Sequence, residues 1–361
     1  MADRTFIMAG GGSGGHVIPL VAVACELRHR RNSCTFFGTR TGFEARLVPA
    51  AGFPIEYIEI GGLNRVGAMK ALRSLAQLPR SVLRVLHHFD QQRPDAIFSL
   101  GGYVAGPVVI AGWWARVPVV IMEPNAIPGL TNRLMGRTAE KVLLNFPDTE
   151  RFFRRDRCEM IGLPVRHDFF DLPPKSREEK LTVLITGGSQ GSRTLNQAVR
   201  GSWKRFREAD VPVRLLHQTG RTSYEEIARE FAESGLEGEV SAFIDDMPVA
   251  FAQADIVVCR AGAGATAELA AARKPSILVP LPTAADNHQF HNANAFATAG
   301  AARLVLDAEM NGERLFDEIR ELNAKRDILE DMGQRAAGFA HPDAAQRAAE
   351  IVERVSYGAK S

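Results

Sequence analysis

The chain has 361 residues, with 44 basic and 42 acidic side chains and a formal charge of only +2. A chain of this length is longer than a domain with one ordinary hydrophobic core, and it suits two domains. The near balance of charge argues against a dedicated nucleic-acid-binding protein, which usually carries a clear basic excess, so we expect no nucleic-acid partner. The four cysteines form no CxxC pair and lie in or beside apolar runs, which favours buried, reduced thiols in a cytosolic protein.

The amino-terminal residues lead directly into a strand-like segment and a glycine loop, unlike a signal peptide. No apolar stretch approaches the roughly 18 residues that span a bilayer. We therefore expect a cytosolic protein, or one that rests on a membrane without crossing it.

Short apolar segments alternate with longer amphipathic ones along the whole chain. The predicted strands are Thr5–Ala9, Cys34–Gly38, Ile55–Ile60, Ala96–Leu100, Val117–Met122, Lys141–Leu144, Leu181–Thr186, Val213–His217, Val240–Ile244, Ile256–Cys259, Ile277–Pro280 and Leu304–Leu306. Several are apolar throughout, as expected of parallel strands covered by helices on both faces. The alternation predicts an α/β protein with doubly wound sheets.

One polar segment, residues 168–180, interrupts this pattern with prolines and charged residues, and it reads as an exposed linker. Each half on either side opens with a strand and a glycine turn, which predicts two Rossmann-like domains. A final helix is expected over residues 343–355.

The first glycine loop, residues 10–15, lies between a predicted strand and a predicted helix. Glycines there let backbone N–H groups approach a ligand, and the helix N-terminus favours an anion, so the loop suits a diphosphate. Gly10, Gly12 and Gly15 also satisfy GxGxxG. The next strand ends without the acid that would hold a dinucleotide ribose, and only Arg40 keeps an NADP interpretation open.

Further polar groups follow the next strands of the first half. His16 comes directly after the glycine loop and is either a general base with a pKa near neutrality or a capping or structural histidine. A second glycine turn, residues 101–107, lies on the carboxyl edge where ligands of open α/β sheets bind. Asn125 could bind a sugar or serve only the turn in which it lies.

The second half repeats this arrangement. Residues 186–192 form another glycine turn between a strand and a helix, a second candidate anion site. Small residues at 261–267 lead to Glu268, which could hold two ribose hydroxyls or only complement a helix dipole. Residues 286–289 offer polar groups to a phosphate or a sugar.

No D-x-D, HExxH or paired CxxC motif occurs, so the sequence supports no metal site and we expect no cofactor, apart from a possible loosely bound divalent cation. Helix N-termini and Arg166 or Arg260 would then have to stabilise a diphosphate leaving group.

The helix-like segment 70–89 is locally basic, with Pro79 expected to interrupt or kink it. It can be a solvated face or, together with Trp113 and its neighbour Trp114, a membrane-surface patch. The basic members are Lys70, Arg73, Arg80 and Arg84.

In these motifs the chain resembles a known family, the bacterial UDP-N-acetylglucosamine:undecaprenyl-pyrophosphoryl-MurNAc-pentapeptide N-acetylglucosaminyltransferases. Members of this family convert lipid I to lipid II in peptidoglycan synthesis. The resemblance extends from Phe6 to about Ala349. The motifs that carry it are Gly11–Val17, Gly101–Pro107, Gly129–Asn132, Pro164–Arg166, Gly187–Gly191, Phe243–Met247, Cys259–Arg260 with Glu268, and His288–Gln289 with Asn292.

The resemblance implies the GT-B fold, two Rossmann-like doubly wound parallel-sheet domains facing across a cleft. Residues 1–163, completed by a C-terminal helix in 341–361, would bind lipid I, and residues 164–340 would bind UDP-GlcNAc. The reaction would transfer GlcNAc with inversion to the C4 hydroxyl of MurNAc, giving a β-1,4 linkage. The protein would lie peripherally on the cytoplasmic face of the inner membrane, against its anionic surface.

The resemblance also implies roles for individual residues, with His16 as the catalytic base. Donor-binding residues would be Ser13, Gly14 and Gly15, together with Asn125 and Gln289 (sugar), Arg166 and Ser189 (phosphate), Ile244 (uracil) and Glu268 (ribose). Acceptor-pyrophosphate residues would be Gly12, Ser13, Gly14, Gly102 and Tyr103. The membrane patch would comprise Arg73, Arg80, Arg84 and Trp113.

Three segments depart from the family pattern, at residues 122–125, 163–166 and 288–289, and they bear mainly on the sugar contacts. Two alternative functions stay open: a lipid glycosyltransferase with another acceptor such as diacylglycerol, and a non-catalytic UDP-sugar-binding subunit.

Overall fold

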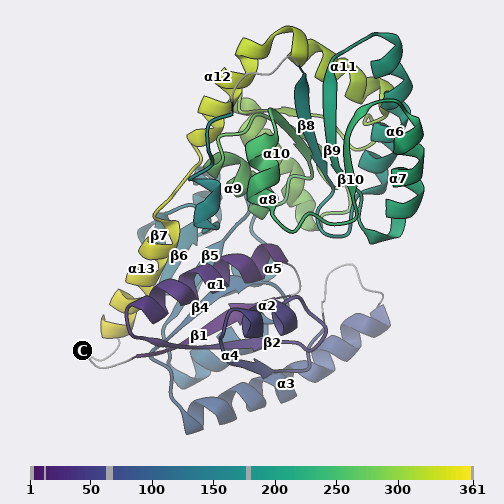
Figure 1. Cartoon of the computed structure of the whole chain (residues 1–361). Helices are drawn as coiled ribbons and strands as arrows, with labels where there is room; N and C mark the ends of the chain where they lie inside the picture. Colours follow the sequence, from purple (N-terminus) through teal and green to yellow (C-terminus); the bar gives the residue numbers. More distant parts are fainter. Residues whose placement is uncertain (1–3, 12–13, 62–67, 176–179, 359–361) are drawn as a thin grey trace. The chain divides into compact units, whose positions relative to one another are not determined.

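The computed structural model describes residues 4–11, 14–61, 68–175 and 180–358. The chain forms two compact units, Met1–Val165 with His341–Ser361, and Arg166–Ala340 (Figure 1). The border therefore precedes the polar segment that was predicted as a linker. This segment is anchored to the second unit, because Phe169 is fully buried against Phe251 and Lys175 is ion-paired with Asp255 at 2.6 Å.

The first unit contains a sheet of seven parallel strands in the order β3-β2-β1-β4-β5-β6-β7. Its strands are β1 (Thr5–Gly10), β2 (Ser33–Gly38), β3 (Ile55–Tyr57), β4 (Ala96–Gly101), β5 (Val119–Glu123), β6 (Lys141–Leu144) and β7 (Cys158–Met160). The central strands β1, β4 and β5 are almost wholly buried, which explains their continuous apolar sequence.

Helices cover both faces of this sheet. On one face α3 (Ala68–Gln91) packs against α4 (Ala105–Ala115), and on the other α1 (Gly14–His29) packs against α13 (Ala344–Gly358) (Figure 1). The short helices α2 (Glu44–Ala50) and α5 (Leu130–Met135) complete the unit. Helix α3 continues through Pro79, so of the two expected effects, an interruption or a kink, the interruption does not occur.

Helix α13, the last of the chain, belongs to the first unit although its sequence follows the second. Its apolar side, including Ile351 and Val352, is buried. Polar contacts add to this packing, because Arg30 forms ion pairs with Glu350 (2.9 Å) and Glu353 (3.3 Å). The last helix is thus held to the first unit by both apolar and polar contacts.

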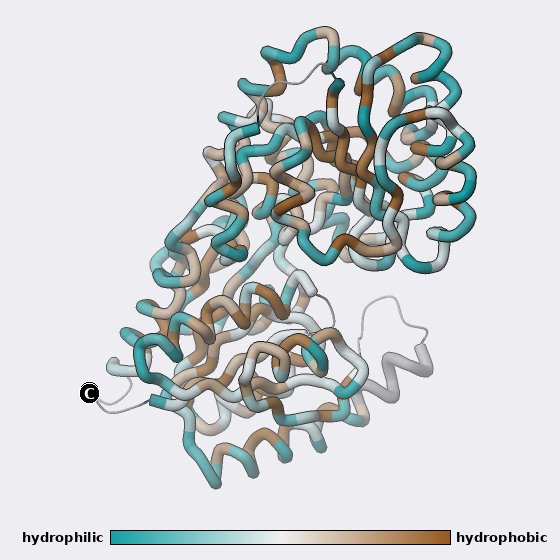
Figure 2. The backbone as a smooth tube through the Cα atoms, viewed as in Figure 1, coloured by the Kyte–Doolittle hydropathy of each residue, from teal (hydrophilic) through white to brown (hydrophobic). Residues whose placement is uncertain are grey.

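The second unit contains six parallel strands in the order β10-β9-β8-β11-β12-β13. They are β8 (Leu181–Thr186), β9 (Val213–Gln218), β10 (Glu237–Ser241), β11 (Ile256–Cys259), β12 (Ser276–Leu278) and β13 (Ala302–Leu304). Figure 2 shows that hydrophobic residues are concentrated in this sheet and that the outer helices carry more hydrophilic residues.

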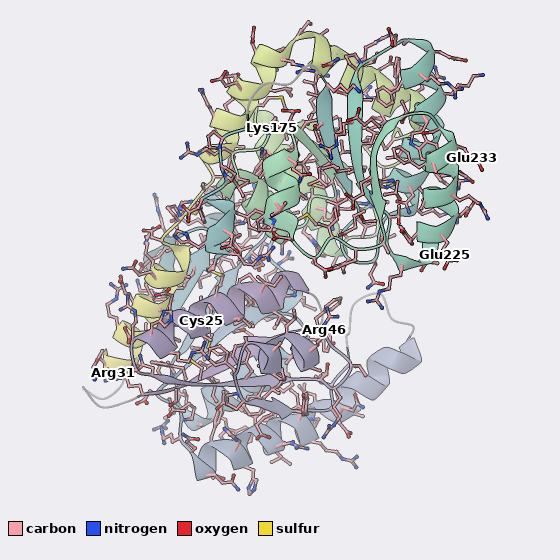
Figure 3. All side chains as sticks on the ribbon, in the orientation of Figure 1. Cys25, Arg31, Arg46, Lys175, Glu225 and Glu233 are labelled. Atoms are coloured by element: carbon pink, nitrogen blue, oxygen red, sulfur yellow. The ribbon has the colours of Figure 1, made fainter. Side chains whose placement is uncertain are left out.

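The helices of the second unit are α6 (Arg193–Glu208), α7 (Tyr224–Glu233), α8 (Met247–Gln253), α9 (Ala263–Ala271), α10 (His288–Thr298), α11 (Gly312–Ala324) and α12 (Arg326–Ala337). Helix α6 packs against α11 and α7, and α9 packs against α12 and α10. The amphipathic pattern is clear on α7, where Ile227 and Phe231 are buried while Glu225 and Glu233 project outward (Figure 3).

Among the described residues, no helix combines the length and apolar character needed to cross a bilayer, and no group of three His, Cys, Asp or Glu side chains is placed to hold a metal ion.

Candidate functional site

Each sheet has one point where the strand order reverses, between β1 and β4 in the first unit and between β8 and β11 in the second. At such points the loops after the two strands diverge to opposite faces, and ligands of open α/β sheets bind in the crevice that results. All four glycine-rich segments found in the sequence follow these four strands. The fold therefore gives each unit one candidate ligand site.

In the first unit, the glycine loop after β1 lies against a buried carboxylate. A Cβ on Gly11 would lie 2.7 Å from Oε1 of Glu44, and a Cβ on Gly38 or Gly42 would lie even closer to this side chain, at 2.5 and 2.2 Å. Glu44 is fully buried and accepts hydrogen bonds from the backbone N (2.9 Å) and Oγ1 (2.8 Å) of Thr39. The sequence did not predict that Glu44 packs against the glycine loop. Gly12 and Ser13 lie outside the described residues.

The loops after β1 and β4 approach each other at His16 and Gly102. Gly102 has a φ of +79°, and a Cβ on it would lie 3.1 Å from the carbonyl oxygen of Gly11 and 3.9 Å from Nδ1 of His16. His16 is half-buried in the first turn of α1, and the space next to Gly14 is open. Gly15 is exposed beside it, and Tyr103 is half-buried against the core. The structure thus brings the imidazole and both glycine loops together.

Glu123, at the end of β5, organises the neighbouring loop. Its carboxylate accepts hydrogen bonds from Asn125 N (2.9 Å), Gly129 N (3.3 Å) and Asn132 Nδ2 (2.9 Å). Burial raises the pKa of Glu123 to about 7, although these donors favour the charged form. Thr131 Oγ1 donates to Gly102 O at 3.2 Å, so this loop also supports the glycine turn after β4.

In the second unit, the glycine turn after β8 is built for close backbone approach. Gly188 has a φ of +82°, and nothing lies within 4 Å of where its Cβ would be. The turn leads into α6, whose N-terminus is capped by Ser192 through Leu195 N. Ser189 is exposed at the tip of the turn. An open turn before a helix N-terminus suits a phosphate group.

Across the same reversal point, Glu268 lies on α9 after β11. Burial raises the pKa of its carboxyl to about 7, and the charge of Arg166 opposes this shift. Within the described residues, no group donates a hydrogen bond to this carboxylate. A half-buried acid without a protein donor keeps its hydrogen-bonding capacity for a ligand or for water.

Two arginines of this unit differ in their surroundings. Arg260 is held by Asp307 (Nη1–Oδ1, 2.5 Å) and donates to Ser192 Oγ at 2.7 Å and to Val279 O at 3.1 Å. Arg166 is exposed and, in the described part of the chain, forms no ion pair. Arg166 is therefore the better placed of the two to meet a diphosphate, while Arg260 fixes the loop before α6.

The other residues of the second unit that were predicted to bind the donor follow strands of the same sheet at its carboxyl edge. The backbone N–H of Ile244 donates to Gln218 Oε1 at 2.8 Å. Gln289 Oε1 accepts from Leu281 N at 3.0 Å, and its amide N–H groups donate to no other described residue. The structure thus groups Arg166, Ser189, Ile244, Glu268 and Gln289 in the second unit, whereas Gly14, Gly15 and Asn125 belong to the first.

The residues expected to form a membrane patch lie on α3 and α4 of the first unit, which pack side by side. Arg80 and Arg84 are exposed, and Leu83 between them is 66% exposed. Trp113 and Trp114 are 66% and 71% exposed beside a cavity of about 680 Å³. The side chain of Arg73 lies outside the described residues.

Two doubly wound parallel-sheet units, each with glycine turns at its reversal point, form an architecture of the GT-B class, like that of the solved structure described below. The model of the glycosyltransferase family 28 N-terminal domain matches residues 6–144, and that of the family 28 C-terminal domain matches residues 182–348. The chain belongs to glycosyltransferase family 28.

Individual relatives match this chain over nearly its whole length. The UDP-N-acetylglucosamine--N-acetylmuramyl-(pentapeptide) pyrophosphoryl-undecaprenol N-acetylglucosamine transferase of Solibacter usitatus is 55% identical over 98% of this chain and 96% of its own. The enzyme of the same name from Halorhodospira halophila is 43% identical over 99% of this chain and 100% of its own. The crystal structure of Acinetobacter baumannii MurG superposes with a TM-score of 0.82, at 31% identity, over 97% of this chain and 99% of that one.

Proposed function

We propose that this enzyme transfers N-acetylglucosamine from UDP-GlcNAc to undecaprenyl-pyrophosphoryl-MurNAc-pentapeptide, forming lipid II for peptidoglycan synthesis. The observation that carries the proposal is the 55% identity, over 98% of the chain, to a relative named for this reaction. The geometry agrees with a nucleotide-sugar donor, because an open glycine turn and an acid without a hydrogen-bond donor lie at one reversal point.

The second unit is the proposed donor domain. Ser189 and Arg166 would meet the diphosphate, Glu268 the ribose and Ile244 the uracil. Gln289 would use its free amide N–H groups on the sugar, with Asn125 as a further sugar contact. A carboxylate that lacks donors suits two ribose hydroxyls, since each hydroxyl supplies one hydrogen bond.

The first unit is the proposed acceptor domain, with the glycine loops around Gly14 and Gly102 on the acceptor pyrophosphate and Tyr103 beside them. His16 would take the proton from the C4 hydroxyl of MurNAc as that oxygen attacks the anomeric carbon, displacing UDP with inversion. Its closeness to Gly102 supports this role, because one imidazole then adjoins both loops.

We also propose that the first unit rests on the anionic cytoplasmic face of the inner membrane. Exposed Leu83, Trp113 and Trp114 supply apolar surface, and Arg80, Arg84 and Arg73 supply the positive charge. Tryptophan suits the boundary between headgroups and acyl chains, and each basic residue near an anionic surface adds about 1 kcal/mol of attraction.

The decisive assay measures transfer of labelled GlcNAc from UDP-GlcNAc by the purified chain, with a lipid I analogue and diacylglycerol as competing acceptors. We expect transfer to the lipid I analogue alone. Transfer to diacylglycerol would favour the lipid-glycosyltransferase alternative. UDP binding without any transfer would favour a non-catalytic subunit.

Membrane binding is tested by co-sedimentation with vesicles of anionic or zwitterionic lipid. We expect binding to the anionic vesicles, weakened by salt, and loss of binding when Arg73, Arg80 and Arg84 are changed to Glu. Exposed Arg229 and Arg320 on the second unit serve as the matched control when changed to Glu. A wild-type protein that stays in the supernatant contradicts the proposal.

A further inference from the structure

Gln218 occupies a central position at the carboxyl edge of the second sheet. It ends β9, which lies between β8 and β10, and it is in register with Thr186 on one side and Ser241 on the other. Its side chain is only 1% exposed. The glycine turn follows β8, and the segment containing Ile244 follows β10, so Gln218 lies between these two ligand-binding segments.

The amide of Gln218 makes hydrogen bonds to both segments. Its Nε2 donates to Thr186 Oγ1 at 3.0 Å and to Gly188 O at 2.9 Å, in the glycine turn. Its Oε1 accepts from Ile244 N at 2.8 Å. Both amide protons and the carbonyl oxygen are thus used, and a residue with fewer donors or acceptors could not join the two segments.

The loop after β9 strengthens the connection by direct backbone packing. A Cβ on Gly191 would lie 2.0 Å from Thr219 O, and one on Gly220 would lie 2.4 Å from Gln190 O. Asn196 of α6 donates to Thr219 O at 3.0 Å. The glycine turn therefore rests on the segment that begins at Gln218, and a displacement of Gln218 would move the turn.

We infer that Gln218 is a positioning residue for the donor: it fixes the spacing between the turn that holds the diphosphate and the Ile244 backbone that holds the uracil. A nucleoside diphosphate is a ligand of nearly fixed span between base and phosphates, so binding both ends at once requires this spacing. The inference rests on the proposed binding of UDP-GlcNAc to the second unit.

The first test replaces Gln218 by Met, which has a similar length and removes all three hydrogen bonds. We expect the Kd for UDP, measured by titration calorimetry, to rise roughly tenfold or more, since loss of even one or two net hydrogen bonds is of that order. The KM for UDP-GlcNAc should rise in parallel, while the KM for the lipid acceptor should stay unchanged.

A second variant, Gln218→Glu, keeps the acceptor for Ile244 N but loses the amide donors. Its carboxyl group can donate to Thr186 or Gly188 only when protonated. Its UDP affinity relative to the wild type at the same pH should therefore improve as the pH is lowered, a response that general destabilisation would not produce.

Ser202→Ala is the matched control, because Ser202 is fully buried in the same unit and donates to Val199 O at 2.7 Å, away from the turn. It should leave the UDP Kd unchanged, whatever its effect on the Tm. Thr186→Val removes one partner of Gln218, and its effect on UDP affinity should be less than additive with that of Gln218→Met.

Three outcomes have distinct meanings. A wild-type protein that binds no UDP removes the proposed function together with this inference. Normal UDP binding by a folded Gln218→Met variant overturns only the positioning role. Equal loss of UDP affinity in the Ser202 control, at equal loss of Tm, overturns it as well, because stability alone would then explain the effect.

Discussion

The guanidinium of Arg260 and the carboxylate of Asp307 form an ion pair that links the end of β11 to the segment after β13, with Nη1 2.5 Å from Oδ1. The other oxygen of Asp307 accepts from Thr194 Oγ1 at 3.1 Å, and Nη2 of Arg260 donates to Ser192 Oγ. Both partners are largely buried. The pair thus holds the N-terminus of α6, the helix that would meet the donor phosphates.

We predict that Asp307→Asn and Arg260→Ala each lower the free energy of unfolding by about 2–4 kcal/mol, because each leaves a buried partner without its counter-charge. The double variant should lose less free energy of unfolding than the sum of the losses in the two single variants. Chemical denaturation measures these values, and the exposed pair Arg320–Asp317 provides a control expected near zero. Additive losses would contradict the pairing.

Glu268 should make UDP binding depend on pH. The pKa of its carboxyl is raised to about 7 by burial, and ribose hydroxyls bind best to the charged form. The Kd for UDP should therefore increase as the pH falls from 8 to 6. Glu268→Gln should bind UDP more weakly at pH 8 and vary less over this range, as measured by calorimetry in the same buffers. Identical pH profiles for the two proteins would remove Glu268 from the ribose role.

Glu268 should also make the stability of the fold depend on pH, in the direction opposite to that of UDP binding. Because the folded-state pKa of Glu268 exceeds its ordinary value of 4.5, the folded protein binds the proton more tightly, and the resulting stability is lost as the pH rises through about 7. The Tm of the wild type should thus fall, relative to that of Glu268→Gln, between pH 5 and 8.

His16→Ala should reduce kcat by a factor of 10² to 10⁴, the usual contribution of a general base, and leave the Kd for UDP unchanged. The reason is that His16 lies in the first unit, whereas the proposed nucleotide contacts lie in the second. Radiolabelled transfer and calorimetry on the same preparation separate the two quantities. Unchanged turnover would assign His16 a capping or structural role instead.

His217 should make the fold sensitive to acid. It is buried, and desolvation lowers its pKa to about 4, while Nε2 lies 3.0 Å from Asn196 Oδ1. The folded state therefore holds the neutral imidazole, and stability is lost as the pH falls from 6.5 toward 4, by on the order of 3 kcal/mol. In denaturation experiments, the free energy of unfolding of His217→Gln should lack this decrease between pH 6.5 and 4. The control His29→Gln, which changes an exposed histidine, should show the same decrease as the wild type.

The sequence predicted the fold where burial is complete. Strands β6, β8 and β11 begin and end where expected, because continuous apolar runs in the middle of a parallel sheet leave little choice of register. The ends of the internal strands β5 and β12 are shifted by one or two residues from the prediction, and further errors lie at or near the sheet edges. Strand β7 was missed, because its three residues are only half-buried, and β10 and β13 begin earlier than predicted.

The supports of the site were harder to predict than the loops themselves. Glycine turns between a strand and a helix have a local signature, so all four were found. Glu44 and Gln218 act through neighbours distant in sequence, such as Gly11 and Ile244, and no local pattern reports such contacts. The position of Gln218 at the end of an apolar strand was the one available signal.

Because helix α13 completes the first unit from the far end of the chain, the order of synthesis and the order of folding must differ. The whole second unit, residues 166–340, is synthesised before the last element of the first unit. During that time the amino-terminal sheet exposes, beside α1, the apolar surface that Ile351 and Val352 later cover. A truncation just after residue 340 would leave that exposure permanent, and we expect such a product to aggregate although every residue assigned to the donor is present.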